Sequence, residues 1–242
     1  GMEAFMSFDP YELDRSYGRA PAESPARYTA KTFMWMFLGL LVSFATGLAL
    51  IFTGAVWYIF SSGAVIMLLV LLELGTVIYL SARIQRMSVG TATLLFFFYA
   101  VLNGVVISSA LLLYGLVEAI LVFALTALYF GVLAAYGYLT KRNLARVGPI
   151  LTSGLIFLVV FWVLALFLPL SGLEIIVSMI GIAVFLGCTA YDTQKIQFFY
   201  QYYAGYPDML AKASIFSALQ LYLDFINLFL YLLRLLGNGK RS

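Results

Sequence analysis

The sequence predicts an all-α integral membrane protein with seven transmembrane helices. Of the 242 residues, 64% are hydrophobic and only 10% are charged, whereas a soluble domain carries about 25% charged residues. Apolar stretches of about 20 residues, the length that crosses a bilayer as a helix, recur along the whole chain. Such a chain would precipitate from water, so its expected surroundings are the lipid bilayer.

Short connections join the apolar stretches, so we expect one compact helical domain over residues 31–237. Residues 1–30 are polar, carry both charge signs and hold three of the six prolines, which indicates a mostly disordered cytoplasmic tail. Residues 238–242 form a short C-terminal tail. The seven predicted spans are 32–54, 62–82, 89–112, 116–138, 148–169, 173–197 and 211–236.

The distribution of Lys and Arg predicts the orientation of the chain in the membrane. Basic residues occur in the N-terminal tail and in or beside the second, fourth and sixth loops, but not in the first, third and fifth. The positive-inside rule therefore places the N-terminus in the cytoplasm. Seven spans put the C-terminus outside, although Arg234, Lys240 and Arg241 lie there. Either packing holds the last helix across the membrane, or that helix re-enters and its tail is cytoplasmic.

Several classes of chemistry are excluded by composition. The chain has no histidine and a single cysteine, Cys188, so Ser-His or Cys-His catalysis, imidazole metal sites and an internal disulfide are absent from it. The formal net charge of +3 gives no reason to expect a nucleic-acid partner. We expect no enzyme activity and no cofactor, and we favour a monomer.

Three acidic residues lie well inside predicted spans, where a charge costs about 2.5–3.5 kcal/mol to insert. They are Glu73, Asp192 and Asp224. Glu73 either lines the same cavity as the two aspartates or pairs with a polar group such as Asn103. Arg83 and Arg86 end the second span, and each is either a positive-inside anchor or a latch, meaning a basic side chain that salt-bridges a carboxylate.

Polar residues recur along one face of the last span. Spacings of 3, 4, 3, 4 and 3 residues form one continuous helical stripe that cannot face lipid. The stripe either lines a pathway or acts as polar glue between helices. We call it the polar stripe, and its members are Ser217, Gln220, Asp224, Asn227, Tyr231 and Arg234.

The short sixth loop makes the last two helices antiparallel neighbours. Asp192 and Asp224 are equally far from residue 208, so a hairpin centred there brings both carboxyls to one depth. Two carboxyls in a dry site share a proton and form a switch. When ionised they can bind Ca²⁺ weakly and transiently, helped by Asn227 and Gln220, as an ion pathway requires.

Two segments together resemble the Bax-inhibitor-motif family of membrane proteins. They are "GCTAYDTQKI" and "LYLDFINLFLYLLRLLG", and the resemblance extends over residues 32–237. It implies six helices wrapped around a central C-terminal helix, a pH-sensitive Ca²⁺ leak, and a paired-aspartate sensor at Asp192 and Asp224. Glu73 matches the family glutamate, whereas the latch arginine aligns with Ile84. The loops look like those of a bacterial inner-membrane member.

Other functions use similar residues. Intramembrane aspartyl proteases also place a Tyr-Asp on one helix and a second Asp on the next, but they need a Gly-x-Gly before the second Asp, where this chain has Leu221 and Leu223 flanking Tyr222. A non-conducting regulator of a membrane protease or of cell death would need no ion path. The sequence favours a pH-gated cation leak whose partners are the bilayer, protons and Ca²⁺.

Overall fold

The computed structural model describes residues 23–238, and within them seven helices are long and apolar enough to cross a membrane. The predictions for the tails at 1–22 and 239–242 lie outside the described residues. Two short 3-10 turns, Leu144–Val147 and Ser171–Leu173, precede α7 and α8. The helices are α2 (Pro25–Phe52), α3 (Ala55–Ser61), α4 (Gly63–Arg83), α5 (Val89–Tyr114), α6 (Leu116–Leu139), α7 (Gly148–Ala165), α8 (Glu174–Tyr202) and α9 (Pro207–Asn238).

Two local signals make the first part of the chain more helical than the hydropathy pattern predicts. Ser24 accepts a hydrogen bond from the Arg27 N–H at 3.2 Å, and Pro25 occupies the first helical turn, so α2 begins there rather than at residue 32. Gly54 adopts a left-handed φ of 74° and starts the short helix α3, which occupies the expected first loop. Residues 25–30 therefore belong to a helix and not to a disordered tail.

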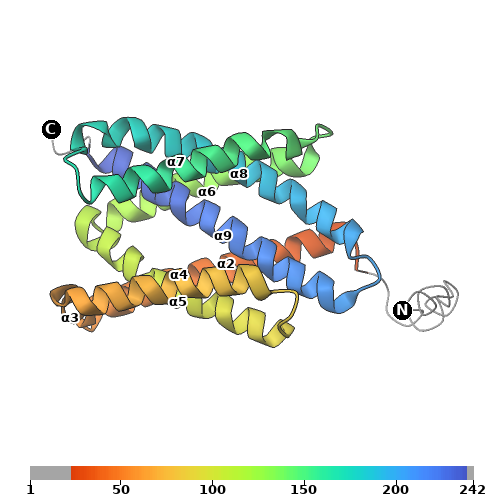
Figure 1. Ribbon diagram of the computed structural model, residues 1–242, viewed down its shortest axis with the longest axis horizontal. Coiled ribbons are helices and arrows are strands. Elements are labelled where there is room, and N and C mark those ends of the chain that lie inside the picture. The colour runs from red at the N-terminus through yellow and green to blue at the C-terminus, as the bar shows by residue number, and fades with distance from the viewer. Residues whose placement is uncertain (1–22, 239–242) are drawn as a thin grey trace, which may run out of the picture.

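Helix α9 lies between two groups of helices (Figure 1), with α2, α4 and α5 on one side and α6, α7 and α8 on the other. It packs against α8, α2, α6 and α5, and it is the most buried of the spans. Helices α4 and α7 pack mainly against α5 and α8. An arrangement in which all six other helices wrap around α9 stays a prediction.

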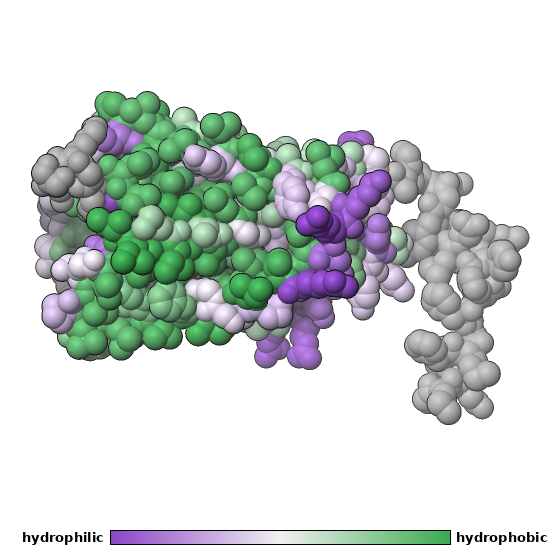
Figure 2. All heavy atoms as spheres, turned by 90° about the horizontal axis from the view of Figure 1, so that it is seen from above, coloured by the Kyte–Doolittle hydropathy of each residue, from purple (hydrophilic) through white to green (hydrophobic). Residues whose placement is uncertain are grey.

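The outer surface fits a bilayer. Figure 2 shows hydrophobic residues over most of the length of one face, with hydrophilic residues gathered towards the end at which α2 begins. We call this end the basic end, because its loops carry Arg83, Arg86, Lys141, Arg142 and Arg146, and we call the opposite end the distal end. Helix α9 runs without a break from the basic end to the distal end, so it crosses the bilayer and does not re-enter.

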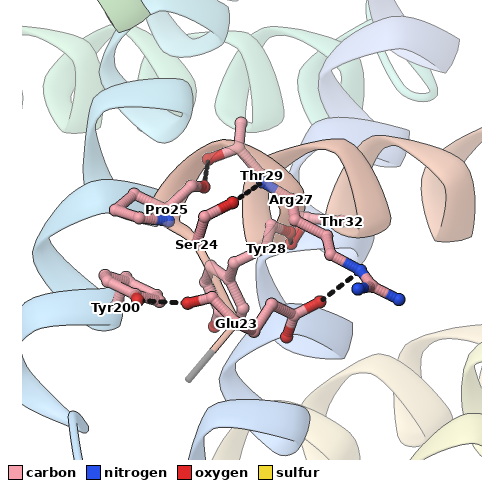
Figure 3. Close-up of polar contacts among 8 residues, drawn as sticks. All are labelled: Glu23, Ser24, Pro25, Arg27, Tyr28, Thr29, Thr32 and Tyr200. Atoms are coloured by element: carbon pink, nitrogen blue, oxygen red, sulfur yellow. Dashed lines mark hydrogen bonds and ion pairs between the residues drawn. The ribbon is translucent and has the colours of Figure 1, made fainter. Parts of the chain in front are cut away.

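The start of α2 is fixed to the α8–α9 hairpin (Figure 3). Figure 3 shows the Tyr200 hydroxyl of α8 donating to the Glu23 carbonyl. The Tyr28 hydroxyl donates to the Leu210 carbonyl on α9 at 2.9 Å. The two tyrosine rings also lie against each other, with centroids 5.3 Å apart. The first and last helices are therefore joined at the basic end.

A buried lysine joins α9 to the α4–α5 loop at the same end. The Lys212 ammonium donates to the carbonyls of Gln85 at 3.0 Å and Met87 at 3.2 Å, and it lies 3.1 Å from the exposed carboxylate of Asp208. The Lys212 residue is only 5% exposed. Because its three donors are used on these groups, the position of this loop depends on Lys212.

Helices α6 and α8 approach each other closely at one glycine. A Cβ added to Gly137 would lie 2.2 Å from the Ala190 carbonyl oxygen, so no larger residue fits without moving the backbone. Gly131, two turns earlier on the same helix, has nothing within 4 Å of its added Cβ. Alanine substitutions at these two glycines therefore separate the effect of close helix packing from the general effect of an added methyl group.

We predict that Gly137→Ala lowers the free energy of unfolding by about 1–3 kcal/mol, because the backbones of α6 and α8 must move apart. Thermal unfolding in detergent measures this. Gly131→Ala is the control and should be neutral or slightly stabilising, since alanine has the higher helix propensity. Equal melting temperatures for the two variants would contradict the close approach.

We predict that Lys212→Met frees the α4–α5 loop, because two backbone carbonyls lose a charged donor worth about 1.5–3 kcal/mol each. Limited trypsin digestion should then cut faster after Arg83 and Arg86. Lys141→Met, which removes an exposed lysine from another loop at the basic end, should leave this cleavage rate unchanged. Unchanged cleavage in Lys212→Met would mean that other contacts hold the loop.

Candidate functional site: a buried carboxyl pair beside the polar face of the last helix

The α8–α9 hairpin brings Asp192 and Asp224 together. Both residues are buried, at 8% and 5% exposure, and their carboxyl groups lie within hydrogen-bonding reach of each other. A carboxylate only accepts hydrogen bonds, so this contact needs one proton on the pair. Two acids placed side by side in this way inside a membrane-spanning region favour a state in which they share one proton.

The residues after Asp192 fix this part of α8 to the loop before α7. Gln194 accepts a hydrogen bond from the Leu144 N–H at 2.9 Å and donates to the Arg142 carbonyl at 2.8 Å. One turn later, Gln197 donates to the Tyr138 carbonyl at the end of α6 at 3.0 Å. Gln194 and Gln197 therefore hold this part of α8 against the end of α6 and the loop that follows it.

Lys195 is the basic group whose charge acts on both carboxyls. It lies one turn after Asp192 and is half-buried, with its ammonium 5.3 Å from the Tyr191 ring centroid and 5.6 Å from that of Phe199. The i, i+3 spacing from Asp192 is visible in the sequence.

Arg83 and Arg86, the latch candidates, are both exposed at the basic end. Within residues 23–238 no ion pair is recorded for either of them. In this conformation they are not joined to the carboxyl pair.

On the face of α9 that carries Asp224, buried oxygens lack donors. Ser217 Oγ, Gln220 Oε1 and Asp224 Oδ2 have no hydrogen-bond partner within the described part of the chain. Asn227 differs, because its amide donates to the Leu223 carbonyl of its own helix at 2.8 Å. Unpaired buried oxygens are costly, and they are also the ligands that hard cations prefer.

Glu73 does not join the aspartate pair. It lies on α4 with its side chain beside that of Tyr99 on α5, and the centroid of the Tyr99 ring lies 6.1 Å from that of Tyr222 on α9. Since Tyr222 and Asp224 are two residues apart on a helix, they point to roughly opposite sides of α9. Glu73 therefore belongs to a second polar region, separated from the aspartates by the helix itself.

A chain of hydrogen bonds completes this second region. The Asn103 amide donates to the Tyr222 hydroxyl at 3.0 Å, that hydroxyl donates to Ser43 Oγ, and Ser43 donates to the Ala100 carbonyl at 2.7 Å. All three side chains are buried. Asn103 thus binds Tyr222 and not Glu73, and no pattern in the sequence indicates that tyrosines are the connecting residues.

The distal part of the stripe meets α7. The Trp162 indole N–H donates to the Tyr231 hydroxyl at 2.8 Å, and the Arg234 guanidinium lies 3.9 Å from the centroid of the Trp162 ring. Phe185 of α8 stacks on the other side, with its centroid 6.0 Å from that of Tyr231. Trp162 carried no signal in the sequence beyond the expected aromatic residue near a membrane interface.

The side chains that could act as metal ligands limit which metal ions the site could bind. Among residues 23–238, no group of three or more His, Cys, Asp or Glu side chains gathers in a way that could hold a metal ion. The carboxyl pair supplies two such groups, with the oxygens of Ser217 and Gln220 on the same helix face. This set suits brief binding of an oxygen-preferring cation rather than a permanent site.

Comparisons with known proteins place the chain in one family. The family described as inhibitor of apoptosis-promoting Bax1 matches residues 26–241. The inner membrane protein YbhL of Escherichia coli strain K12 is 39% identical over 224 residues, covering 88% of this chain and 92% of YbhL. The uncharacterized protein RP147 of Rickettsia prowazekii is 38% identical over 218 residues, covering 90% of this chain and 92% of that protein.

An uncharacterized protein of Borreliella burgdorferi adds a third relative, at 35% identity over 217 residues, covering 89% of this chain and 94% of the relative. The family match begins at the start of α2 and extends past the end of α9, and each of these relatives is matched over more than nine-tenths of its own length. The chain is therefore an integral membrane protein that belongs to the Bax inhibitor family.

Proposed function

We propose that this protein is a pH-sensitive cation leak pathway of a bacterial inner membrane, in which Asp192 and Asp224 sense protons and Ca²⁺ is the favoured ion. The observation that carries the proposal is the direct contact between two buried carboxyls on neighbouring helices. A structural role alone would be served equally well by asparagine, which needs no proton and carries no charge.

Protonation changes the force between α8 and α9. With one shared proton, the pair is held together by a hydrogen bond and carries a single negative charge. When that proton leaves, two negative charges face each other in a poorly hydrated site, and the pair is driven either to separate or to bind a cation. Ser217 and Gln220 offer oxygens along the same face for a cation that arrives.

The proposed cation site is weak by construction, because two carboxylates and a few neutral oxygens fall short of the six to eight ligands that hold Ca²⁺ tightly. Weak binding suits permeation, since an ion that binds too tightly does not leave. Lys195 opposes cation entry, because its charge attracts the ionised carboxylates and competes with the cation for them. The sign of the pH dependence is set by the balance of these two attractions.

Glu73, Asn227 and Tyr231 stay predicted lining residues, and Arg83 and Arg86 stay predicted latch residues. Glu73 is on the other side of α9 in this conformation, so a role in the same pathway requires α4 or α9 to move. Arg83 and Arg86 are on the loop that Lys212 holds, so their approach to the aspartates requires that contact to break.

A second candidate function is a non-conducting regulator. The family description, inhibitor of apoptosis-promoting Bax1, supports it because inhibition of another protein requires no ion path. An intramembrane aspartyl protease is the third candidate, and it needs a water molecule between the two acids and access for a peptide. Flux through purified protein separates these functions.

We predict that the purified protein in liposomes passes Ca²⁺ with a dependence on pH that Asp192→Asn or Asp224→Asn abolishes or shifts strongly. The physical reason is that asparagine neither shares nor releases the proton. A Ca²⁺-sensitive dye inside the liposomes measures the flux. Glu174→Gln, which removes the carboxyl at the distal start of α8, is the matched control and should behave like the unchanged protein.

Three outcomes would contradict parts of this proposal. Unchanged pH dependence in both aspartate variants would remove the sensor role. A protein that passes no cation at any pH would favour the regulator. Cleavage of a transmembrane peptide, lost in either variant, would favour the protease.

We also predict that the thermal stability of the protein in detergent falls as the pH rises through the titration of the pair. The stabilising hydrogen bond exists only while the pair keeps its proton, so its contribution is present at low pH and lost at high pH. Asp192→Asn and Asp224→Asn should flatten this dependence, because an amide donates a hydrogen bond at every pH. A wild-type slope that both variants retain would assign the pH dependence to other groups.

A further inference from the structure

A crevice lies between α7 and α9 in the distal half of the protein. Two adjoining cavities of about 470 Å³ and about 190 Å³ form it, and Trp162, Asn227 and Tyr231 line both. Helix α7 packs mainly against α8, so it leaves this space beside α9. Residues of α7 therefore form one wall of the crevice and residues of α9 form another.

One side of the crevice opens to the hydrocarbon of the bilayer. Val159, Val163 and Leu166 of α7 line it and are 63%, 50% and 79% exposed, although they belong to or directly follow a membrane-spanning helix. Exposed apolar side chains at this depth face lipid. A hydrocarbon chain can enter the crevice sideways without crossing any polar surface.

The other end of the crevice holds an unpaired positive charge. Arg234 is the one charged residue among those that line either cavity. Its Nη1 atom is buried without a hydrogen-bond partner, and no ion pair is recorded for Arg234 within residues 23–238. A guanidinium has five N–H donors arranged for carboxylate or phosphate oxygens, and stacking on Trp162 leaves its edge available.

The depth of Arg234 matches that of a lipid headgroup. It lies one turn before the distal end of α9 at Asn238, and Trp162 lies one turn before the end of α7 at Ala165. Tryptophan near a helix end is typical of the level at which headgroups meet hydrocarbon. An anion bound to Arg234 would thus stand at the height of the phosphate in the distal leaflet.

We propose that this crevice binds an anionic phospholipid of the distal leaflet, with its phosphate on Arg234 and one hydrocarbon chain along α7. The lateral opening and the headgroup depth favour a membrane lipid over an acid that arrives from water. A net negative headgroup is favoured because Arg234 is the only charged residue of the described chain that lines the crevice, and it would repel the ammonium group of a zwitterionic lipid. The inference goes beyond ion conduction and holds whether or not the protein passes cations.

Trp162 allows this binding to be measured at the site itself. The chain has three tryptophans, so Trp35→Phe and Trp57→Phe together leave Trp162 as the single fluorophore. Lipids with bromine on their chains quench tryptophan on contact. We expect dibromo-phosphatidylglycerol to bind beside Trp162 about tenfold more strongly than dibromo-phosphatidylcholine, because Arg234 attracts the phosphate of both lipids but repels the ammonium group that only phosphatidylcholine carries.

Variants of Arg234 separate charge from structure in the same background. Arg234→Gln should reduce the ratio of the two binding constants to about one, and Arg234→Lys should keep a preference for the anionic lipid. The ratio is internal to each variant, so a change in the basal fluorescence of Trp162 does not affect it. Arg83→Gln, which removes an exposed cation at the basic end, should leave the ratio unchanged.

Equal quenching by the two lipids would overturn the proposal, as would a preference that persists in Arg234→Gln. Stronger quenching by a brominated fatty acid than by either phospholipid, lost in Arg234→Gln, would overturn the phospholipid as the occupant. Unfolding of Arg234→Gln would show as loss of the monodisperse protein peak, and the Arg234→Lys ratio would then decide the question.

Discussion

The structure depends on the requirement that α9 keep its polar side chains away from lipid. A bilayer offers no hydrogen bonds, so every polar group at that depth needs a partner inside the protein. Helix α9 carries polar residues on two sides, with Tyr222 on one and Asp224 on the other, and it therefore needs protein on both. Packing against α2 and α5 on one side and α6 and α8 on the other meets this requirement.

The two sides of α9 differ in how completely their buried polar groups are hydrogen-bonded. On the side of α2 and α5, Asn103, Tyr222 and Ser43 form a closed chain in which each donor has an acceptor. On the side of α8, Asp192 and Asp224 depend on a proton, and Ser217 and Gln220 are left without donors. A polar network in which every group is hydrogen-bonded keeps one geometry, whereas a network with unpaired groups can change with pH or with a bound ion. The aspartate side is therefore where a change of state costs least.

The spans and the matching depth of the two aspartates could be predicted because both depend on residues that are close together in the sequence. Hydropathy fixes each long helix, and a short loop fixes two helices as an antiparallel hairpin, so the depth of Asp192 and Asp224 follows from counting residues. The start of α2 was misplaced because Ser24 and Pro25 act through capping, which hydropathy does not include. The partners of Glu73 and Arg234 could not be predicted, because Tyr99 and Trp162 reach them only through the packing of separate helices.

In the proposed cation pathway, two charged residues of the polar stripe would act on the ion in opposite ways. Asp224 attracts it, but Arg234, about 15 Å further along α9, repels it. The stacking of Arg234 on Trp162 does not remove this charge; it only places the charge beside the crevice. An anionic lipid there would neutralise Arg234 and lower the barrier at the distal end, while leaving the proton chemistry of the aspartates unchanged. Lipid composition and pH would then act on the same path from opposite ends, through groups that do not touch.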